Sequence, residues 1–256
     1  MAEARTIRIA ALSDIHYGRH SRHHMKELFE SASAAADVLL LCGDLTDYGT
    51  REEAEILGMD LREHVHIPML GVLGNHDFES GTPEIVTEIM EESGVQMLDG
   101  DCAVIHDVGF AGVSGFGGGF GRFMLNAWGE PLIKQFVQAS VDEELKLEQA
   151  LTKLQTDHRV VLMHYAPICQ TVANEPKEIW PFLGSSRLEN PLNRFGALAC
   201  FHGHSHNGAP EGKTTSGIPV YNVCIHVLSH HYPDQPPFRL LEIDTSVPAN
   251  TEQAEA

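Results

Sequence analysis

The stretch FHGHSHNG places three histidines at alternate positions, His202, His204 and His206. Imidazole nitrogens are common ligands of transition metals in proteins. In an extended segment alternate side chains point to the same side, so the three rings would share one face. Periodicity alone therefore nominates all three histidines as metal ligands.

Four further fragments rich in Asp, Asn and His follow apolar runs elsewhere in the chain. They are Asp14-Ile15-His16, Gly43-Asp44, Gly74-Asn75-His76-Asp77 and His164. Taken singly, each is typical of a turn or of a hydrogen-bonded core histidine. All five fragments end an apolar run, however, and chance explains such a series poorly. Because the carboxyl ends of strands in an α/β sheet share one edge, we expect these side chains to converge in space.

Alternating apolar runs and amphipathic stretches would position these fragments. The runs at 7–14, 38–44, 68–77 and 159–167 predict buried strands, and 25–36, 51–64, 83–94 and 131–156 have helical patterning. Strands that alternate with helices in the first half predict parallel βαβ units. After Gly94 closely spaced apolar segments favour antiparallel strands, and further strands are expected at 196–206, 218–224 and 238–244.

The chain is predicted to form a single domain over residues 1–245. The long Pro- and Asn-containing segment 168–196 is expected to be an ordered excursion near the site rather than a linker. Residues 246–256 are polar and lack an apolar pattern, so they are expected to be a disordered tail.

Composition limits the class of protein further. No apolar run approaches the roughly 20 residues of a membrane span, and the first residues lack a secretory signal, so a cytoplasmic location is expected. The five cysteines are scattered without a CxxC pair, which disfavours disulfides and a structural zinc site. Lys and Arg number 17 against 36 Asp and Glu, a net charge of −19 that disfavours nucleic acid as a partner.

The ordered series D-x-H, G-D, G-N-H-D, H and G-H-x-H resembles the calcineurin-like metallophosphoesterase superfamily, which includes purple acid phosphatases and class III cyclic nucleotide phosphodiesterases. The resemblance runs from about residue 7 to residue 206, and each motif is present without a substitution. It implies an α/β fold, a four-layer α/β/β/α sandwich of two mixed sheets flanked by helices. It also implies a dinuclear metal site between the loops that follow the strands.

The resemblance implies a ligand for every position of such a site. Asp44 would bridge the two metals, since a carboxylate can give one oxygen to each. Asp14, His16 and His206 would complete the first metal, and Asn75, His164 and His204 the second. Ligation by nitrogen and oxygen without thiolate suits two divalent or trivalent ions such as Mn, Fe or Zn better than Ca²⁺. His202 is left without a position and is expected either to support the ligands from behind or to pack in the core.

The same resemblance assigns the catalytic roles. A hydroxide between the metals would attack phosphorus in line while the metals hold the phosphoryl oxygens. His76 would lie beside the leaving-group oxygen as a general acid or charge donor. Asp77 would orient His76, although a simple turn residue is the other interpretation.

The predicted function is therefore hydrolysis of a small phosphoester by a dinuclear metal-dependent phosphoesterase. Aromatic residues within and after the Gly-rich segment 115–123 (Phe116, Phe120, Phe123, Trp128) could border a larger leaving group, which favours phosphodiester or nucleotide substrates. A phosphomonoesterase is the alternative. A metal-dependent nuclease is disfavoured by the charge, and a non-catalytic protein-binding member of the fold by the intact motifs. The oligomeric state is left open.

Segment 115–123 fails the dinucleotide-binding and P-loop patterns, and the nearby GVSGF fails GxSxG. We expect this segment to be either a flap over the substrate or a structural crossing.

His20, His23 and His24 would either shape the substrate pocket or begin a solvated helix. Arg122, Asn126 and Arg187 are candidates for contacting a second substrate group.

Overall fold

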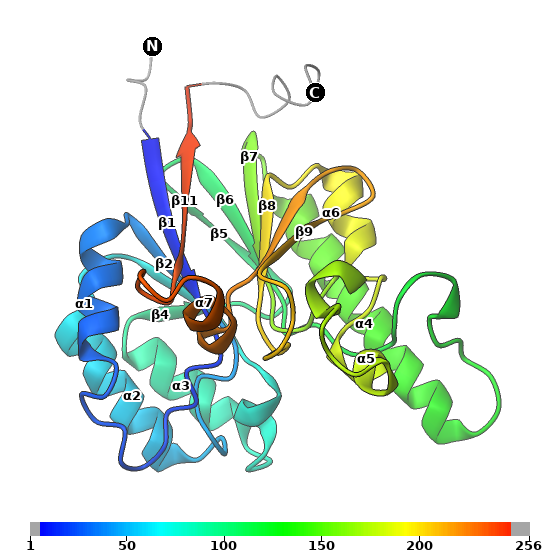
Figure 1. Ribbon diagram of the computed structural model, residues 1–256, viewed down its shortest axis with the longest axis horizontal. Coiled ribbons are helices and arrows are strands. Elements are labelled where there is room, and N and C mark those ends of the chain that lie inside the picture. The colour runs from blue at the N-terminus through cyan, green and yellow to red at the C-terminus, as the bar shows by residue number, and fades with distance from the viewer. Residues whose placement is uncertain (1–5, 247–256) are drawn as a thin grey trace.

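The computed structural model describes residues 6–246, which form two β-sheets with helices on their outer sides (Figure 1). The expected C-terminal tail, 246–256, lies outside the described residues from position 247 onward. Within the described part of the chain, no helix is both long enough and apolar enough to cross a membrane.

The first sheet has the order β11-β1-β2-β3-β4. Its strands are β1 (Thr6–Leu12), β2 (Val38–Cys42), β3 (Met69–Val72), β4 (Val95–Met97) and β11 (Arg239–Asp244). Strands β1 to β4 run parallel, and β11 pairs antiparallel with β1. The connections carry α1 (Lys26–Ala35), α2 (Arg51–His64) and α3 (Pro83–Glu92), as parallel crossovers require.

The second sheet has the order β5-β6-β7-β8-β10-β9. Its strands are β5 (Asp101–Ile105), β6 (Val108–Gly112), β7 (His158–Leu162), β8 (Ala199–His202), β9 (Glu211–Lys213) and β10 (Pro219–Asn222). The four central strands are parallel, and β5 and β9 are antiparallel edge strands. The remaining helices are α4 (Pro131–Lys153), α5 (Trp180–Leu183), α6 (Glu189–Phe195) and α7 (Ile225–His231).

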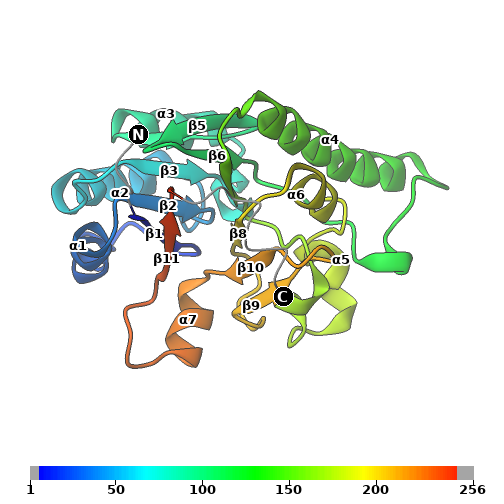
Figure 2. The same ribbon diagram turned by 90° about the horizontal axis from the view of Figure 1, so that it is seen from above.

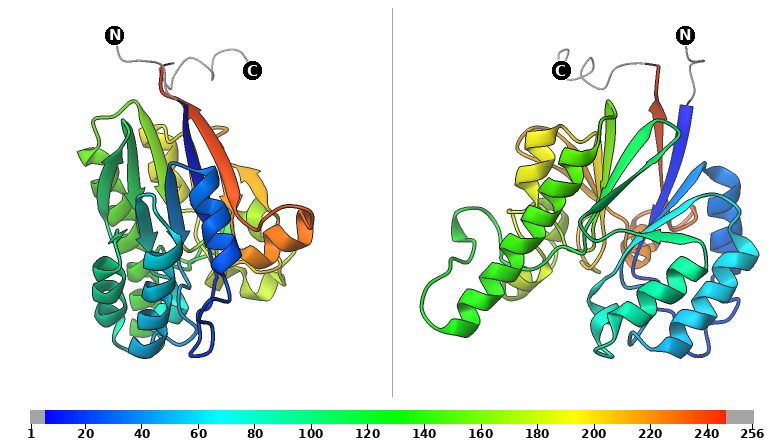
Figure 3. Two further views of the ribbon diagram at one scale, coloured as in Figure 1. Left: turned by 90° about the vertical axis from the view of Figure 1, so that its left-hand side faces the viewer. Right: turned by 180° about the vertical axis from the view of Figure 1, so that it is seen from behind.

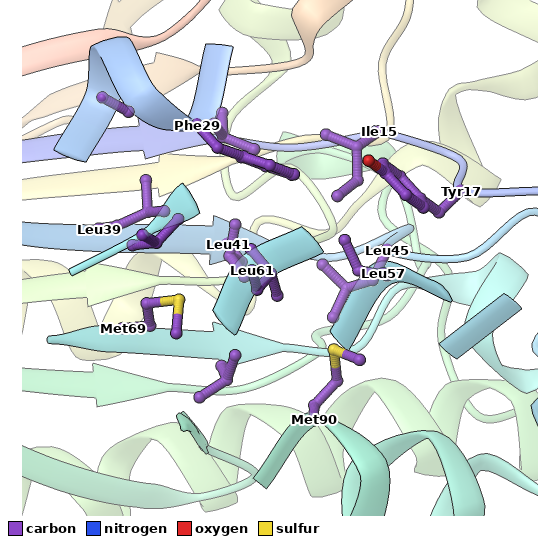
Figure 4. Packing of buried hydrophobic residues seen from close by; sticks show 14 of the residues in the cluster. Ile15, Tyr17, Phe29, Leu39, Leu41, Leu45, Leu57, Leu61, Met69 and Met90 are labelled. Atoms are coloured by element: carbon purple, nitrogen blue, oxygen red, sulfur yellow. The ribbon is translucent and has the colours of Figure 1, made fainter. Parts of the chain in front are cut away.

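The helices and sheets form four layers, and an apolar cluster fills each of the three spaces between them. One cluster packs α1, α2 and α3 on the first sheet, and includes Leu39, Leu41 and Leu57 (Figure 4). A second, with Leu40 and Phe110, fills the space between the two sheets. A third packs α4 and α6 on the second sheet. Figures 2 and 3 show the two groups of helices on opposite outer sides. The predicted four-layer α/β/β/α fold is confirmed.

Strand β2 shows why the sequence folds this way. All five of its residues are buried, because its alternate side chains face two different apolar clusters. A strand covered on both faces is a continuous apolar run rather than an alternating one. Helix α2 then begins at a capping box, in which the Thr50 hydroxyl accepts from the Glu53 N–H and the Glu53 carboxylate accepts from the Thr50 N–H.

Two local expectations need correction. The closely spaced segments directly after Gly94 are not uniformly antiparallel: β4 extends the first sheet in parallel, whereas β5 and β6 form an antiparallel pair. The flap hypothesis for 115–123 is not supported either, because Gly117, Gly118 and Gly119 are buried. The Gly118 N–H donates to the Pro181 carbonyl at 2.7 Å, and the Gly119 N–H to the Gly184 carbonyl at 2.8 Å. These glycines form a packed crossing against 181–184.

The layer between the sheets predicts a large stability effect for Leu40→Ala. Leu40 is fully buried in that layer. The lost burial and the remaining cavity should lower the free energy of unfolding by about 2–5 kcal/mol. Urea denaturation measures the change, and Leu132→Ala on α4, where the side chain is 76% exposed, is the control. Equal effects of the two substitutions would contradict the assignment of this layer as the core.

Candidate metal centre

The loops after five strands bring the seven predicted ligands together where the two sheets meet. Asp14 and His16 follow β1, Asp44 follows β2, Asn75 follows β3, His164 follows β7, and His204 and His206 follow β8. Their donor atoms form two groups, each within 4.8 Å: Asp14, His16, Asp44 and His206, and then Asp44, His164 and His204. Asn75 joins the second group, since its Oδ1 lies 3.1 Å from His164 Nε2. The two groups thus share a single residue, Asp44.

The Asp44 carboxylate faces one group with each oxygen. Its Oδ1 lies 3.4 Å from His164 Nε2, and its Oδ2 lies 3.8 Å from His16 Nε2. The side chain is only 1% exposed. The His76 N–H donates to Oδ1 at 2.8 Å and holds the carboxylate in this orientation. Such a buried carboxylate between two sets of nitrogen donors has the arrangement of a bridging ligand.

Asp14 is held between the two ends of the His204–His206 loop. Its Oδ1 lies 2.9 Å from His206 Nε2, and both of its oxygens accept from the His204 N–H at 3.1 Å. Burial alone would raise the pKa of Asp14, but the hydrogen bond with His206 and the charge of His164 hold this pKa below its usual range. Asp14 is therefore ionised at neutral pH.

Two of the predicted histidine ligands form a hydrogen bond between one ring nitrogen and a backbone carbonyl. His164 Nδ1 lies 3.0 Å from the Cys42 carbonyl, and His204 Nε2 lies 3.1 Å from the Phe182 carbonyl. A proton on each of these nitrogens leaves the other nitrogen of the ring as a ligand atom. Metal-binding histidines are commonly oriented by this kind of second hydrogen bond.

The charges in the second group favour a cation. Burial opposes protonation of His164, but the adjacent Asp44 carboxylate raises the pKa of His164 to about 9. Positive charge is thus favoured beside Asp44, and a metal ion could supply it in place of the proton. Burial lowers the pKa of His204 to about 4, which keeps this ring in the neutral form that binds metals.

The backbone is strained at four of the predicted ligands. Asp14, His16, Asp44 and His204 have φ values of 58°, 44°, 48° and 67°, in the left-handed region that non-glycine residues rarely adopt. Such strain concentrates at functional sites, where the surrounding structure holds it. Gly74 and Gly203 permit the close packing, since a Cβ on Gly74 would collide with Asp44 and one on Gly203 with Asp14.

The donor set fits transition-metal ions. His16 Nε2 is buried and has no hydrogen-bond partner, although it faces the Asp44 carboxylate. A buried nitrogen without a partner is costly, and coordination would satisfy it. Imidazole, carboxylate and amide donors suit Mn, Fe or Zn. The assignment of individual residues to individual ions stays a prediction.

His76 lies beside this centre, but its orienting partner differs from the expected one. His76 Nδ1 lies 2.7 Å from the Asp47 carbonyl, and its ring centroid lies 4.5 Å from that of His16. The Asp77 carboxylate is fully buried and instead accepts from the Gly74 N–H and from the backbone and hydroxyl of Thr46. Asp77 therefore shapes the loops around the centre rather than holding the His76 ring.

Sequence reasoning missed two residues that support the site. Asp47 supplies the carbonyl to His76, and its carboxylate lies 3.8 Å from His16 Nδ1. Glu175 is buried and accepts from Ser205 Oγ and the Asn207 N–H, which fixes the loop of the H-x-H motif. A backbone carbonyl has no sequence signature, and Glu175 lies in an irregular segment, so neither role could be found from pattern.

The other singled-out residues lie apart from the ligand set. His202 is fully buried, with Nε2 at 2.8 Å from Thr171 Oγ1 and Nδ1 at 2.8 Å from the Gly203 carbonyl, in keeping with a packing role. Arg187 is buried and donates to the Leu125 carbonyl, and Arg122 lies over the exposed Phe123 ring. Arg187 thus holds the backbone at Leu125 and Arg122 lies at the surface, and contact of either with a second substrate group stays a prediction.

The comparisons with known proteins agree with this geometry. The sequence pattern of the calcineurin-like phosphoesterase family matches residues 7–208, well over half of the chain. A search of curated proteins found no match.

Solved structures share the fold at low sequence identity. A phosphopantetheinyl hydrolase from Mycobacterium tuberculosis has a TM-score of 0.68 at 15% identity, over 91% of this chain and 95% of that one. TT1561 of Thermus thermophilus has a TM-score of 0.52 at 13% identity, over 94% and 100%. GAP50, the anchor in the inner membrane complex of Plasmodium, has a TM-score of 0.51 at 10% identity, over 87% and 73%. The resemblance seen in the motifs is confirmed: the chain belongs to the calcineurin-like phosphoesterase family of metal-dependent phosphoric ester hydrolases.

Proposed function

We propose that this protein hydrolyses small phosphodiesters at a centre of two metal ions, which share Asp44. The observation that carries the proposal is the Asp44 carboxylate, which turns one oxygen to His16 and the other to His164 from a buried position. Two ions bound there would lower the pKa of a water and polarise the phosphoryl oxygens for in-line displacement. Mn, Fe or Zn suits the donors.

The protein's own residues prepare the site for this reaction. Asp14, Asp44 and Asn75 offer oxygen donors, and the histidines offer ring nitrogens, two of them oriented by hydrogen bonds to backbone carbonyls. His76 Nδ1 is engaged by the Asp47 carbonyl, which leaves Nε2 available toward a leaving-group oxygen. The His76 side chain is 33% exposed, so a substrate can reach it. We assign it as the group that donates a proton or positive charge to the departing oxygen.

Two hollows beside the centre support a substrate with an organic group on each side of phosphorus. One, of about 580 Å³, is lined by His16 and Asp47 together with Arg19, His20, His24 and Tyr48. The other, also about 580 Å³, is lined by Asn75 together with Phe78, Phe116, Lys146 and Tyr165. A monoester would occupy one hollow only, so this arrangement favours a diester over the phosphomonoesterase alternative.

The chemistry of the two hollows narrows the substrate class. The first hollow combines Arg19 and two histidines with the carboxylates of Asp47 and Glu53, which suits a polar group, and the aromatic rings of the second hollow suit an organic group. The structural neighbour from Mycobacterium tuberculosis is named as a phosphopantetheinyl hydrolase. A phosphopantetheinyl ester and a nucleotide are therefore both candidate substrates. The net charge of −19 disfavours long nucleic acids.

Hydrolysis of a chromogenic diester tests this proposal. Purified protein loaded with Mn²⁺ should hydrolyse bis(p-nitrophenyl) phosphate with a higher kcat/KM than p-nitrophenyl phosphate. Asp44→Asn should abolish both reactions, because the amide cannot carry the negative charge that bridges two cations. Asp234→Asn, at an exposed acid, is the control. The absorbance of the released p-nitrophenolate measures both rates.

A wild-type protein inert with Mn²⁺, Fe²⁺, Zn²⁺ and Mg²⁺ would overturn the catalytic proposal. A higher kcat/KM for the monoester would favour the phosphomonoesterase instead. Adding a cyclic nucleotide to the same metal-loaded sample distinguishes nucleotide from other diester substrates.

His76→Ala tests the role of the group nearest to the leaving oxygen. We expect kcat to fall by about 10²–10⁴, the range for general acid–base catalysis, with the metal content unchanged. Steady-state kinetics and elemental analysis of the same sample give both quantities. Loss of metal together with activity would show that His76 is a ligand, contrary to the assignment.

Alanine substitutions at His202 and at His204 should have different effects on kcat. His202→Ala removes hydrogen bonds to Thr171 and Gly203 and should lower the unfolding midpoint, while the folded protein keeps most of its kcat. His204→Ala removes a predicted ligand and should lower kcat by at least about 10²-fold, the size that the loss of a catalytic group commonly has. Thermal unfolding and kinetics on matched samples decide, and equal losses of kcat would refute the distinction.

A further inference from the structure

A second cluster of metal-binding side chains lies outside the candidate centre, where the loop after β1 packs on the end of α2. His23 comes from the loop, and Asp60, Glu63 and His64 come from α2. Their donor atoms all lie within 4.8 Å of one another. None of these four residues belongs to the ligand set described above. The His23 ring thus lies against the end of α2, and the residue itself is exposed in the turn that leads into α1.

The two imidazoles meet at a distance that suits a shared ion. His23 Nδ1 lies 3.3 Å from His64 Nε2. Two nitrogens bound to one tetrahedral Zn²⁺ at about 2.0–2.1 Å lie about 3.3–3.4 Å apart. The pair thus already has the spacing of two zinc ligands.

Carboxylates complete the surroundings of the imidazole pair. Glu63 Oε1 lies 4.0 Å from His64 Nε2, and Asp60 Oδ1 lies 3.5 Å from His23 Nδ1. The half-exposed Glu63 side chain has freedom to close on an ion. Glu30 Oε1 lies 3.3 Å from His64 Nδ1, so it can hold the proton there and leave Nε2 as the ligand atom. A carboxylate behind a metal-binding histidine commonly orients the ring in this way.

The local charge leaves room for a cation. Arg22 forms ion pairs with Asp60 and with Glu63 Oε2, and Glu63 Oε1 stays available. Asp60 is fully buried and also accepts from Tyr17 Oη and from the His23 N–H. Three carboxylates, of Glu30, Asp60 and Glu63, face the Arg22 guanidinium, the Lys26 ammonium at 3.8 Å from Glu30 Oε1, and two imidazoles, so negative charge remains in excess when the imidazoles are neutral. Asp60 is thereby committed to fixing the loop, and Glu63 is the carboxylate ligand.

We propose that His23 Nδ1, His64 Nε2 and Glu63 bind one transition-metal ion, Zn²⁺ by its preference for these donors, with Glu30 and Asp60 as supporting partners. The ion would connect α2 to the segment that follows β1. That segment also carries Asp14 and His16, so the bound ion would fix the chain that presents two predicted ligands of the centre. The proposed site is structural and is separate from the hydrolytic function.

Metal stoichiometry tests the site directly. Protein is loaded with Zn²⁺, freed of excess by gel filtration, and analysed for zinc per chain. His23→Ala and His64→Gln should each lose one equivalent relative to wild type, whereas His66→Ala, at an exposed histidine two residues after His64, should lose none. Zinc should also raise the thermal unfolding midpoint more in wild type than in His23→Ala. The His23 side chain is 49% exposed, so its replacement should leave the fold intact even if that of the buried His64 does not.

The outcome does not depend on the catalytic centre. In an Asp44→Asn background, His23→Ala should still remove one equivalent of zinc. If His23→Ala binds as much zinc as wild type and keeps the same zinc-dependent midpoint, the pair is an ordinary hydrogen bond between histidines and the proposal is overturned. A loss of the same size in His66→Ala would also overturn it, because zinc would then be bound non-specifically by surface histidines.

Discussion

The structure depends on placing two carboxylates, Asp14 and Asp44, out of water where the sheets meet. Burial of an uncompensated carboxylate is costly, so these groups require nearby positive charge and hydrogen-bond donors. Histidines that follow β7 and β8, on the other sheet, place ring nitrogens beside the carboxylates that follow β1 and β2. The buried carboxylates of the first sheet are therefore compensated by histidines of the second sheet. The centre exists only when both sheets are packed together.

Backbone pairing beyond the strand ends keeps the first two loops in register. The Asp14 N–H donates to the Gly43 carbonyl at 3.0 Å, and the His16 N–H donates to the Asp44 carbonyl at 3.1 Å. The loops after β1 and β2 thus run side by side even though their φ values are strained. Each non-glycine residue in such a conformation costs about 1–3 kcal/mol. The apolar layers on both faces of the first sheet, illustrated for one face in Figure 4, offset this cost.

Much of the fold followed from periodicity, because apolar runs and amphipathic stretches record which faces are covered. The strands around 38–44 and 159–167 and the helices around 51–64 and 131–156 were all predictable in this way. The strands nevertheless end earlier than the apolar runs suggest, at Cys42 and Leu162. The polar residues that follow adopt loop conformations, which turn their side chains into the space between the sheets.

The wrong expectations for segment 115–123 and for Asp77 have a common physical origin, because both depend on contacts that residue order does not reveal. The glycines at 117–119 resemble a mobile loop by composition, but the backbone at Pro181 and Gly184 holds them. Asp77 is next to His76 in sequence, yet the short 3₁₀ turn over Asn75–Phe78 directs the two side chains to different partners.

Local patterns and motifs were enough to establish the order of the elements, the family and the chemical nature of the donors, since each of these is a property of neighbouring residues. Packing alone decided how these side chains are oriented and which residues they contact. Packing turned one Asp44 oxygen toward each histidine group, engaged His202 with Thr171, and joined His23 to His64 across 41 positions. Residue types are local properties, whereas the orientation of a carboxylate or an imidazole depends on atoms that the tertiary structure brings together.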